Sequence, residues 1–429
     1  MLSQRYELQI LEKGNYSKEH IVPYEGSLPP LEGSSIRVQS NIIGLTTNNI
    51  SYARLGDEPG RDFFAAHPLP FKEGIYSDSS KYARISAWGI GTIIDSTVSF
   101  VPIGTQIWGY LPIATLPVDK IIQLSKVKDV IIETTSHRQI LMPAYNRYFV
   151  IDKAHAESKR FQAYSALIKV LFETSYALNR LCFPWDPKSV PVNPAGLHPK
   201  LDTWSREHAN LRNAMVIIMP ASSKTAFSFA YMLRFMRPIH EQPEGVIGIS
   251  SAGSRKFCEE TKLYDKVVLY ANAESVPSKL AQDLGVSTTE KVILIDFGAR
   301  EGVQDLWRGK LEAIFGTVVF IRVGTAIPER ISLEEDEERR KTDSISSKPN
   351  SYSTITSKLH DAGMELYGEA EYLADLSREF DRFLEHDCIE ALKPVWGQGM
   401  KGPDGVEGGW DRLCAGKMAA ATGLVYRLP

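Results

Sequence analysis

Residues 214–236 read AMVIIMPASSKTAFSFAYMLRFM, and this stretch decides the fold of the chain. Its first six residues form a short, continuous apolar run, which is typical of a strand buried on both faces of a parallel sheet. Residues 225–236 carry apolar side chains at helical spacing, so we expect a helix directly behind the strand. A strand, a turn of small residues and a helix in this order predict the first unit of a parallel α/β sheet.

The alternation of strand and helix continues after this unit. Further apolar runs predict strands at residues 246–250, 266–270, 292–297 and 316–323. Helical periodicity predicts helices at residues 255–263 and 276–284 between them. Such a sheet binds its ligands beyond the carboxyl ends of its strands.

The first 150 residues have a different pattern. Short apolar runs are broken by Pro, Gly, Asn and Asp, which predicts a small β-barrel or sandwich. Residues 163–181 then carry apolar side chains at helical spacing and link the two parts. Two polar tracts, 184–213 and 329–352, are predicted to be surface insertions, so the chain has two domains and no third core.

Composition restricts the possible partners. The 429 residues are 43% hydrophobic and 24% charged, with a net charge of -3, so neither disorder nor attraction to nucleic acid is expected.

No apolar run approaches the length of a membrane helix and the first residues lack a secretory apolar region, which predicts a cytoplasmic protein with no membrane contact. Four distant cysteines and nine scattered histidines predict neither disulfides nor a metal site. A small-molecule substrate fits this balance.

The turn after the first strand is the sharpest candidate site. Backbone N–H groups and the helix start can face a phosphate there, together with the side chains of Ser222, Ser223, Lys224 and Thr225. A P-loop is rejected because it requires glycine inside the strand. A dinucleotide turn would align its three glycines with Ala221, Ser223 and Ala226, so it lacks glycine throughout. A plain turn with a serine cap and no ligand stays open.

The end of the second strand tests which dinucleotide could bind. An NAD-selective fold places Asp or Glu there, whereas this chain has a loop of Ser, Ala and Gly followed by Arg255 and Lys256. Ser251, Ser254 and Arg255 could hold a 2′-phosphate, so NADP(H) is favoured over NAD(H). A solvated loop without a ligand is the alternative.

The sequence gives no sign of a nucleophilic serine or cysteine, because it has no G-x-S-x-G motif and each cysteine is isolated. Tyrosines, histidines and hydroxyl groups are therefore the candidate groups for proton transfer. Tyr52, Tyr110 and Tyr145 are the candidate proton donors. Packing in the core is the competing role for each of them.

Four features together resemble one large superfamily. They are Gly44 to Asn49, Val101 to Tyr110, the helix with Thr174-Ser175-Tyr176, and the nucleotide-type strand and helix run. The whole is similar to the medium-chain dehydrogenase/reductases, whose v-x-x-G-d-x-V-x-G segment matches residues 102–109.

Within that superfamily the chain more closely resembles the family DUF2855. The resemblance rests on five short sequence motifs: LTTNN at residues 45–49, WGYLPIAT at 108–115, YNRY at 145–148, ASSKTA at 221–226 and LYD at 263–265. It covers nearly the whole chain apart from the two polar tracts.

The resemblance implies an α/β architecture with a GroES-like β-barrel domain and a Rossmann-type doubly wound parallel sheet domain. The barrel would span residues 1–160, with part of residues 353–429 returning to it, and the Rossmann domain residues 161–328. Quinone and enoyl reductases of the superfamily need no zinc, in agreement with the scattered histidines and cysteines.

The resemblance also implies site residues in the cleft between the domains. Thr46 and Asn49 fall where those enzymes use Asn and Asp in an L-N-x-x-D run at the active-site floor, so both are changed here. Phe297 and Gly324 lie at the strand ends that run beside the nicotinamide. Tyr270, at the end of the third predicted strand, joins them as a predicted cofactor-binding residue.

Three functions remain open from the sequence. The first is a zinc-independent, NADP(H)-dependent reductase of an activated double bond or carbonyl in a small apolar metabolite, in secondary metabolism. The second is a cofactor-free isomerase, dehydratase or lyase of natural-product biosynthesis on the same scaffold. The third is a binding protein that kept the fold and lost catalysis. A homodimer through residues 317–323, expected to be an edge strand, is the candidate assembly.

Overall fold

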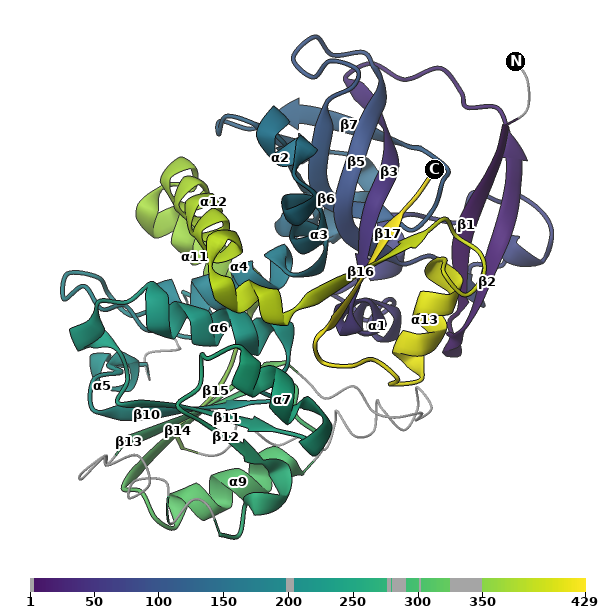
Figure 1. The fold of residues 1–429 in the computed structure, drawn as a ribbon. Coiled ribbons are helices and arrows are strands. Elements are labelled where there is room, and N and C mark those ends of the chain that lie inside the picture. The colour runs from purple at the N-terminus through teal and green to yellow at the C-terminus, as the bar shows by residue number, and fades with distance from the viewer. Residues whose placement is uncertain (1–3, 198–203, 276–278, 280–290, 301, 325–348) are drawn as a thin grey trace.

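The computed structural model describes residues 4–197, 204–275, 279, 291–300, 302–324 and 349–429. Within these ranges an antiparallel barrel and a parallel sheet are joined by helices, and Figure 1 shows them as two separate bodies of strands. The predicted fold class is therefore confirmed.

The barrel closes through six strands. In order around it they are β3 (Ser35–Leu45), β5 (Ser86–Ser96), β6 (Gln106–Pro112), β9 (Arg147–Val150), β8 (Val130–Glu133) and β7 (Val118–Leu124), and β7 pairs back to β3. Strand β3 is buried along both faces because helix α3 (Lys159–Leu167) packs on its outer side. Gly44 permits this contact, since a Cβ there would lie 2.2 Å from the Ala166 carbonyl oxygen.

Further strands extend the barrel from both ends of the chain. The C-terminal strand β17 (Thr422–Arg427) pairs antiparallel with β3, and β16 (Lys393–Gln398) pairs parallel with β17. A separate three-stranded sheet holds β1 (Gln4–Glu12), β2 (Asn15–Gly26) and β4 (Tyr82–Ala83). The last residues of the chain thus return to the barrel, as Figure 1 shows in yellow beside purple.

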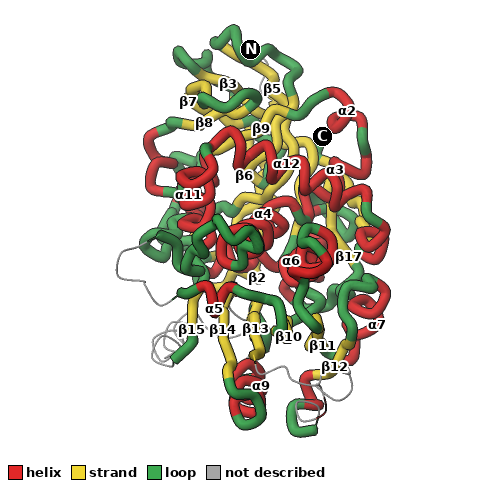
Figure 2. The backbone as a smooth tube through the Cα atoms, turned by 90° about the vertical axis from the view of Figure 1, so that its left-hand side faces the viewer, coloured by secondary structure: helices red, strands yellow, loops and turns green. Residues whose placement is uncertain are grey.

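The parallel sheet contains six strands. Their order is β12 (Lys266–Leu269), β11 (Gly245–Ser250), β10 (Ala214–Met219), β13 (Lys291–Phe297), β14 (Thr317–Gly324) and β15 (Ser351–Ser353), which Figure 2 shows side by side. Strand order reverses beside β10, so the ends of β10 and β13 form the switch point at which such sheets bind ligands.

Both faces of this sheet are covered, which explains the continuous apolar run of β10. Val216 and Ile218 belong to the core that includes helix α6 (Lys224–Phe235), whereas Met215 and Ile217 pack in the core of helix α9 (Val303–Glu312). Alternate side chains of one strand therefore serve two cores.

The linking helix differs from its prediction. Residues 159–182 form α3, helix α4 (Lys169–Ala177) and a closing π turn (Leu178–Cys182) instead of one helix. The break lies at Ile168, whose φ of −133° is outside the helical range. Helix α4 can consequently pack against α6 while α3 stays on the barrel.

The remaining described helices lie around the two bodies of strands. They are α1 (Thr47–Arg54), α2 (Lys153–Glu157), α5 (Arg206–Ala209), α7 (Ala252–Glu260), α11 (Thr356–Tyr367), α12 (Glu369–Glu385) and α13 (Val406–Cys414). Single 3₁₀ turns lie at residues 63–66, 75–77, 136–140, 143–146, 239–241, 270–272 and 387–391.

Two predictions about segments are modified by the structure. Residues 317–323 are not an edge strand, because β15 pairs with residues 320–322 of β14. A homodimer stays a prediction. The 184–213 tract is not all surface, since Val192, Trp204 and Leu211 are buried in the core. The helix predicted at 276–284 and most of the 329–352 tract lie outside the described residues.

Candidate active site

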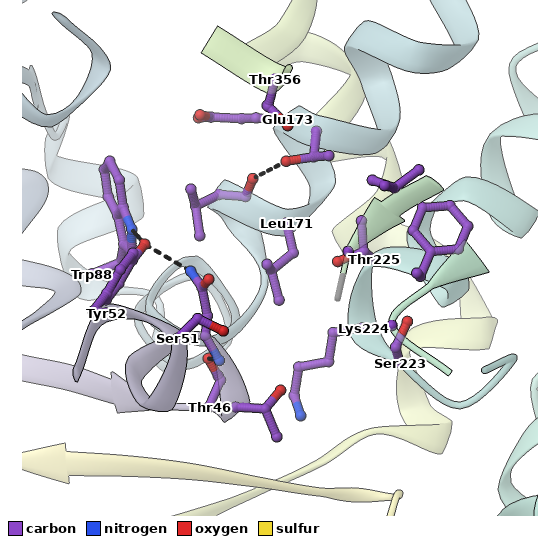
Figure 3. A pocket seen from close by; sticks show the side chains of 18 of the residues that line it. Thr46, Ser51, Tyr52, Trp88, Leu171, Glu173, Ser223, Lys224, Thr225 and Thr356 are labelled. Atoms are coloured by element: carbon purple, nitrogen blue, oxygen red, sulfur yellow. Dashed lines mark hydrogen bonds between the residues drawn. The ribbon is translucent and has the colours of Figure 1, made fainter. Parts of the chain in front are cut away.

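A cavity of about 600 Å³ lies where the barrel, helix α4 and the parallel sheet meet. The barrel contributes residues of α1 and β5, the sheet contributes the ends of β10, β13 and β14, and the C-terminal part of the chain closes one side. Figure 3 shows the barrel side chains and the α6 side chains facing each other across this space. The volume lies within the range of small-molecule sites, about 300–1,000 Å³.

The barrel wall is built by the first turn of α1. Thr46 is the N-cap, with its hydroxyl accepting from the Asn48 N–H at 3.2 Å. Asn48 then directs its side-chain amide to the Tyr52 hydroxyl at 2.7 Å, and the Trp88 indole N–H donates to the same oxygen at 2.7 Å (Figure 3). With two donors on its oxygen, Tyr52 directs its own proton to the Tyr145 hydroxyl, with which it shares a side-chain hydrogen bond.

The three candidate tyrosines form one aromatic cluster. The ring centroids of Tyr52 and Tyr110 are 5.1 Å apart, and those of Tyr110 and Tyr145 are 4.9 Å apart. Burial raises the pKa of Tyr145 to about 12, and burial with the neighbouring tyrosines raises the pKa of Tyr52, so both hydroxyls stay protonated at neutral pH.

Only some of the predicted catalytic residues line the cavity. Thr46, Tyr52 and Tyr145 do. Tyr110 is fully buried and Asn49 is 3% exposed, and neither is among the lining residues. The Asn49 carboxamide oxygen accepts from the Thr46 N–H at 2.8 Å, and its amide donates to the Ser86 carbonyl at 3.1 Å, so it fixes the start of α1. Catalytic roles for all five stay predictions.

The turn after β10 forms the opposite wall. Ser222, Ser223, Lys224 and Thr225 all line the cavity. Ser223 caps α6, its hydroxyl accepting from the Ala226 N–H at 3.1 Å, with φ −68° and ψ 147°. No residue from 220 to 226 has a positive φ, so this turn needs no glycine for its backbone conformation.

Lys224 is the cation of this wall. Among the described residues its amine has neither a hydrogen bond nor an ion pair, and Figure 3 shows its side chain reaching across the cavity towards Thr46. Burial lowers the pKa of its amine to about 8. An anion bound over the turn would favour the charged form of this amine, so the wall suits a phosphate.

The loop after β11 contributes less than predicted. Ser254 lines the cavity, but Ser251 and Arg255 are not among the lining residues. Ser251 caps α7 and lies 2.9 Å from the Ser254 hydroxyl, while the Arg255 guanidinium pairs with Glu259 at 2.6 Å. Tyr270 packs against the α9 side of the sheet and is also outside the lining. The predicted role of Ser251, Ser254 and Arg255 in holding a 2′-phosphate, and that of Tyr270 in cofactor binding, stay untested.

The ends of β13 and β14 complete the sheet side. Phe297 and Gly324 both line the cavity. A Cβ at Gly324 would lie 2.7 Å from the Phe297 carbonyl oxygen, so the strand ends approach each other more closely than a side chain allows. Asp296, beside them, accepts from the Gly298 and Ala299 N–H groups at 2.9 and 2.6 Å and orders the following turn.

Two lining residues with shifted pKa values, Glu173 and His360, were missed by sequence reasoning. Glu173 of α4 has a buried Oε1 without a hydrogen-bond partner, and burial raises the pKa of its carboxyl to about 7. His360 of α11 lies 2.9 Å from the Tyr372 hydroxyl, and burial lowers the pKa of its ring to about 4. The sequence offered one signal for Glu173, which is a glutamate inside the otherwise apolar stretch 163–181. It lies four residues after Lys169, however, and this spacing is that of an ordinary ion pair on a helix surface.

The described residues form neither a cluster of metal ligands nor a helix that could span a membrane. In the part of the chain that the structure describes, no three His, Cys, Asp or Glu side chains come together as metal ligands. Across the same residues, no helix combines the length and apolarity that crossing a bilayer requires.

A closed barrel, a parallel sheet and a cavity between them are also the fold of solved enoyl reductases. Three solved structures are similar to the chain at this level. The CurF ER cyclopropanase from the curacin A biosynthetic pathway has a TM-score of 0.54 at 14% identity, with 99% of this chain and 100% of that chain covered. Mycobacterial Rv1454c complexed with NADPH has a TM-score of 0.52 at 14% identity, with 99% and 100% covered. A mutant enoyl thioester reductase from Candida tropicalis has a TM-score of 0.53 at 10% identity, with both chains fully covered.

A protein-family model identifies the family of the chain. The model of "Protein of unknown function (DUF2855)" matches residues 43–419, and the chain belongs to this family. The match includes the α1 wall and the turn after β10, so both sides of the cavity lie within the family region. No curated protein matches the chain.

Proposed function

We propose that the protein is a zinc-independent, NADP(H)-dependent reductase that reduces an activated double bond or carbonyl in a small apolar metabolite. One observation carries the proposal: a single cavity joins a phosphate-type turn at the switch point of the sheet to the tyrosine wall of the barrel. The structural likeness to an enoyl thioester reductase and to an NADPH complex supports it.

The residues of the sheet wall fit a nicotinamide dinucleotide. Lys224 and the hydroxyl of Ser222 face the cavity and would hold the phosphates at the start of α6. No side chain could project from position 324, since a Cβ there would lie 2.7 Å from the Phe297 carbonyl oxygen, and a flat ring could lie against this glycine. Bound NADPH would supply the hydride.

The opposite wall fits an apolar substrate with one polar group. Trp88, Met142 and Leu171 give the cavity apolar surface. The Tyr145 hydroxyl, which accepts from Tyr52, can donate its own proton to a substrate carbonyl, and a protonated Glu173 carboxyl can deliver the proton that reduction requires. A likeness to an enzyme of the curacin A pathway supports a place in secondary metabolism.

Calorimetric titration with NADPH tests the proposal. We expect saturable binding, followed by oxidation of NADPH when an enone, enoyl thioester or quinone is added. A titration without saturable heat would overturn the proposal.

The pH dependence of this binding is a further prediction. Because the free Lys224 amine has a pKa lowered to about 8 and bound phosphate favours its charged form, NADPH affinity falls as the pH rises through 8. If only the ammonium form binds, affinity at pH 9 is about ten-fold below that at pH 7. Lys224→Met should bind weakly with a flat profile between these values, and equal profiles for both proteins would contradict the assignment.

A second candidate function is a cofactor-free isomerase, dehydratase or lyase of natural-product biosynthesis. The observation that favours it is Glu173, whose pKa of about 7 suits both donation and removal of a proton near neutral pH. Turnover of a substrate without NADPH, lost in Glu173→Gln, would support this candidate over the first.

A further inference from the structure

A second cavity of about 470 Å³ lies between the barrel and helix α12. Its barrel side holds Trp108 of β6 and Phe149 of β9, and its helical side holds Leu373 and Phe380 of α12. Helix α4 contributes Lys169 to this cavity, whereas Glu173 of the same helix lines the candidate active site. The second cavity is therefore separate in its lining residues from the proposed reductase site.

Lys169 is the unusual residue of this cavity. It is only 6% exposed, and its Nζ lies 4.2 Å from the Trp108 ring centroid and 4.7 Å from that of Phe149. Among the described residues its amine has no hydrogen bond and no ion pair, so three N–H donors remain unused in an apolar surround. A buried ammonium without an acceptor is costly, and the cation–π contacts offset only part of that cost.

The acidic residues that line the cavity pair with His155 or Lys128 and not with Lys169. His155 lies between Asp152, 2.6 Å from its Nδ1, and Asp381, 3.3 Å from its Nε2. These carboxylates are 63% and 42% exposed, which places them at the mouth while Lys169 lies at the inner end. The exposed Lys128 and Asp129 pair with each other at 3.9 Å. Burial lowers the pKa of Lys169, and the charges of Glu173 and Asp381 oppose this shift.

We propose that this cavity is a second ligand site, which binds a small apolar molecule carrying a carboxylate. The carboxylate accepts hydrogen bonds from the Lys169 ammonium at the inner end. The apolar body packs against Phe161, Leu373 and Phe380. The volume lies within the range of small-molecule sites, about 300–1,000 Å³. The charge and the three unused donors of Lys169 favour a carboxylate over a neutral group.

Octanoate is the probe, titrated calorimetrically into the full chain. We expect saturable binding that Lys169→Met weakens by at least about ten-fold, since methionine keeps the apolar stem and removes the charge. Octanamide, which has the same shape without the charge, should bind at least about ten-fold more weakly than octanoate. Lys224→Met is the matched control, because it removes the cation of the other cavity and should leave octanoate affinity unchanged.

A second variant keeps the proposal testable if Lys169→Met is unstable. Ala374 is an exposed residue of α12 that lines the cavity, so Ala374→Trp should close the mouth and abolish octanoate binding while Lys169 stays in place. The proposal is overturned by absent saturable binding, by equal affinities for octanoate and octanamide, or by loss of binding in Lys224→Met instead of Lys169→Met.

Discussion

Replacing Ser223 with tyrosine is expected to weaken NADPH binding by at least about 100-fold, which corresponds to about 2.7 kcal/mol of binding free energy. Ser223 lines the cavity at the first turn of α6, where the proposed pyrophosphate would approach the backbone. A phenol ring at this position would occupy that space. Calorimetric titration of the variant and the wild type, side by side, measures the effect.

Two smaller substitutions at the same position are the controls. Ser223→Ala removes the cap to the Ala226 N–H and should lower the free energy of unfolding by about 1 kcal/mol, yet leave NADPH affinity within a few-fold of the wild type. Ser223→Gly should bind NADPH at least as well as the wild type. Wild-type affinity in Ser223→Tyr would show that a dinucleotide, if bound, lies away from this turn.

The tyrosine variant also separates the two candidate functions. A reductase loses turnover together with NADPH binding. A cofactor-free isomerase or lyase keeps turnover, since its chemistry rests on the barrel wall and Glu173. Loss of turnover in a folded Ser223→Tyr protein would therefore exclude the cofactor-free alternative.

Much of the parallel sheet could be predicted from sequence. Burial on both faces makes β10, β11 and β13 continuous apolar runs, and the predicted strands agree with the observed ones to within about one residue at most ends. Strand β15 was missed because it is three residues long and follows a polar tract. The break at Ile168 was missed because apolar periodicity continues across it.

Sequence predicted the part of the candidate site that one continuous segment of the chain forms. The turn from Ser222 to Thr225 carries its own signal, since strand, turn and helix are contiguous. Glu173 and His360 reach the cavity from different helices, so only tertiary packing identifies them. Arg255 was predicted to reach the site but is not a lining residue. Its guanidinium pairs with Glu259, one turn later on the same helix.

Replacing Glu133 with glutamine is expected to lower the free energy of unfolding by about 3–5 kcal/mol. In the barrel, the Lys120 Nζ and the Arg138 Nε each lie 2.9 Å from one Glu133 oxygen, and all three side chains are about 1% exposed. The Tyr148 hydroxyl donates to the same carboxylate at 2.8 Å. Glutamine would leave two buried cations without a countercharge. Denaturant unfolding, followed by fluorescence and circular dichroism, measures the loss.

The exposed pair of Lys153 and Glu157 is the matched control for this network. Its atoms are 3.9 Å apart on side chains 88% and 70% exposed, so Glu157→Gln should change stability by less than about 0.5 kcal/mol. Acid gives a second test. Burial opposes the charge of Glu133, but Lys120 and Arg138 hold the pKa of its carboxyl below the ordinary value. Its contribution is therefore present above the ordinary carboxyl pKa and is lost as the pH falls through the lowered one. The wild type should lose more stability on acidification than Glu133→Gln, and parallel losses would show that the carboxylate is not the countercharge of the barrel.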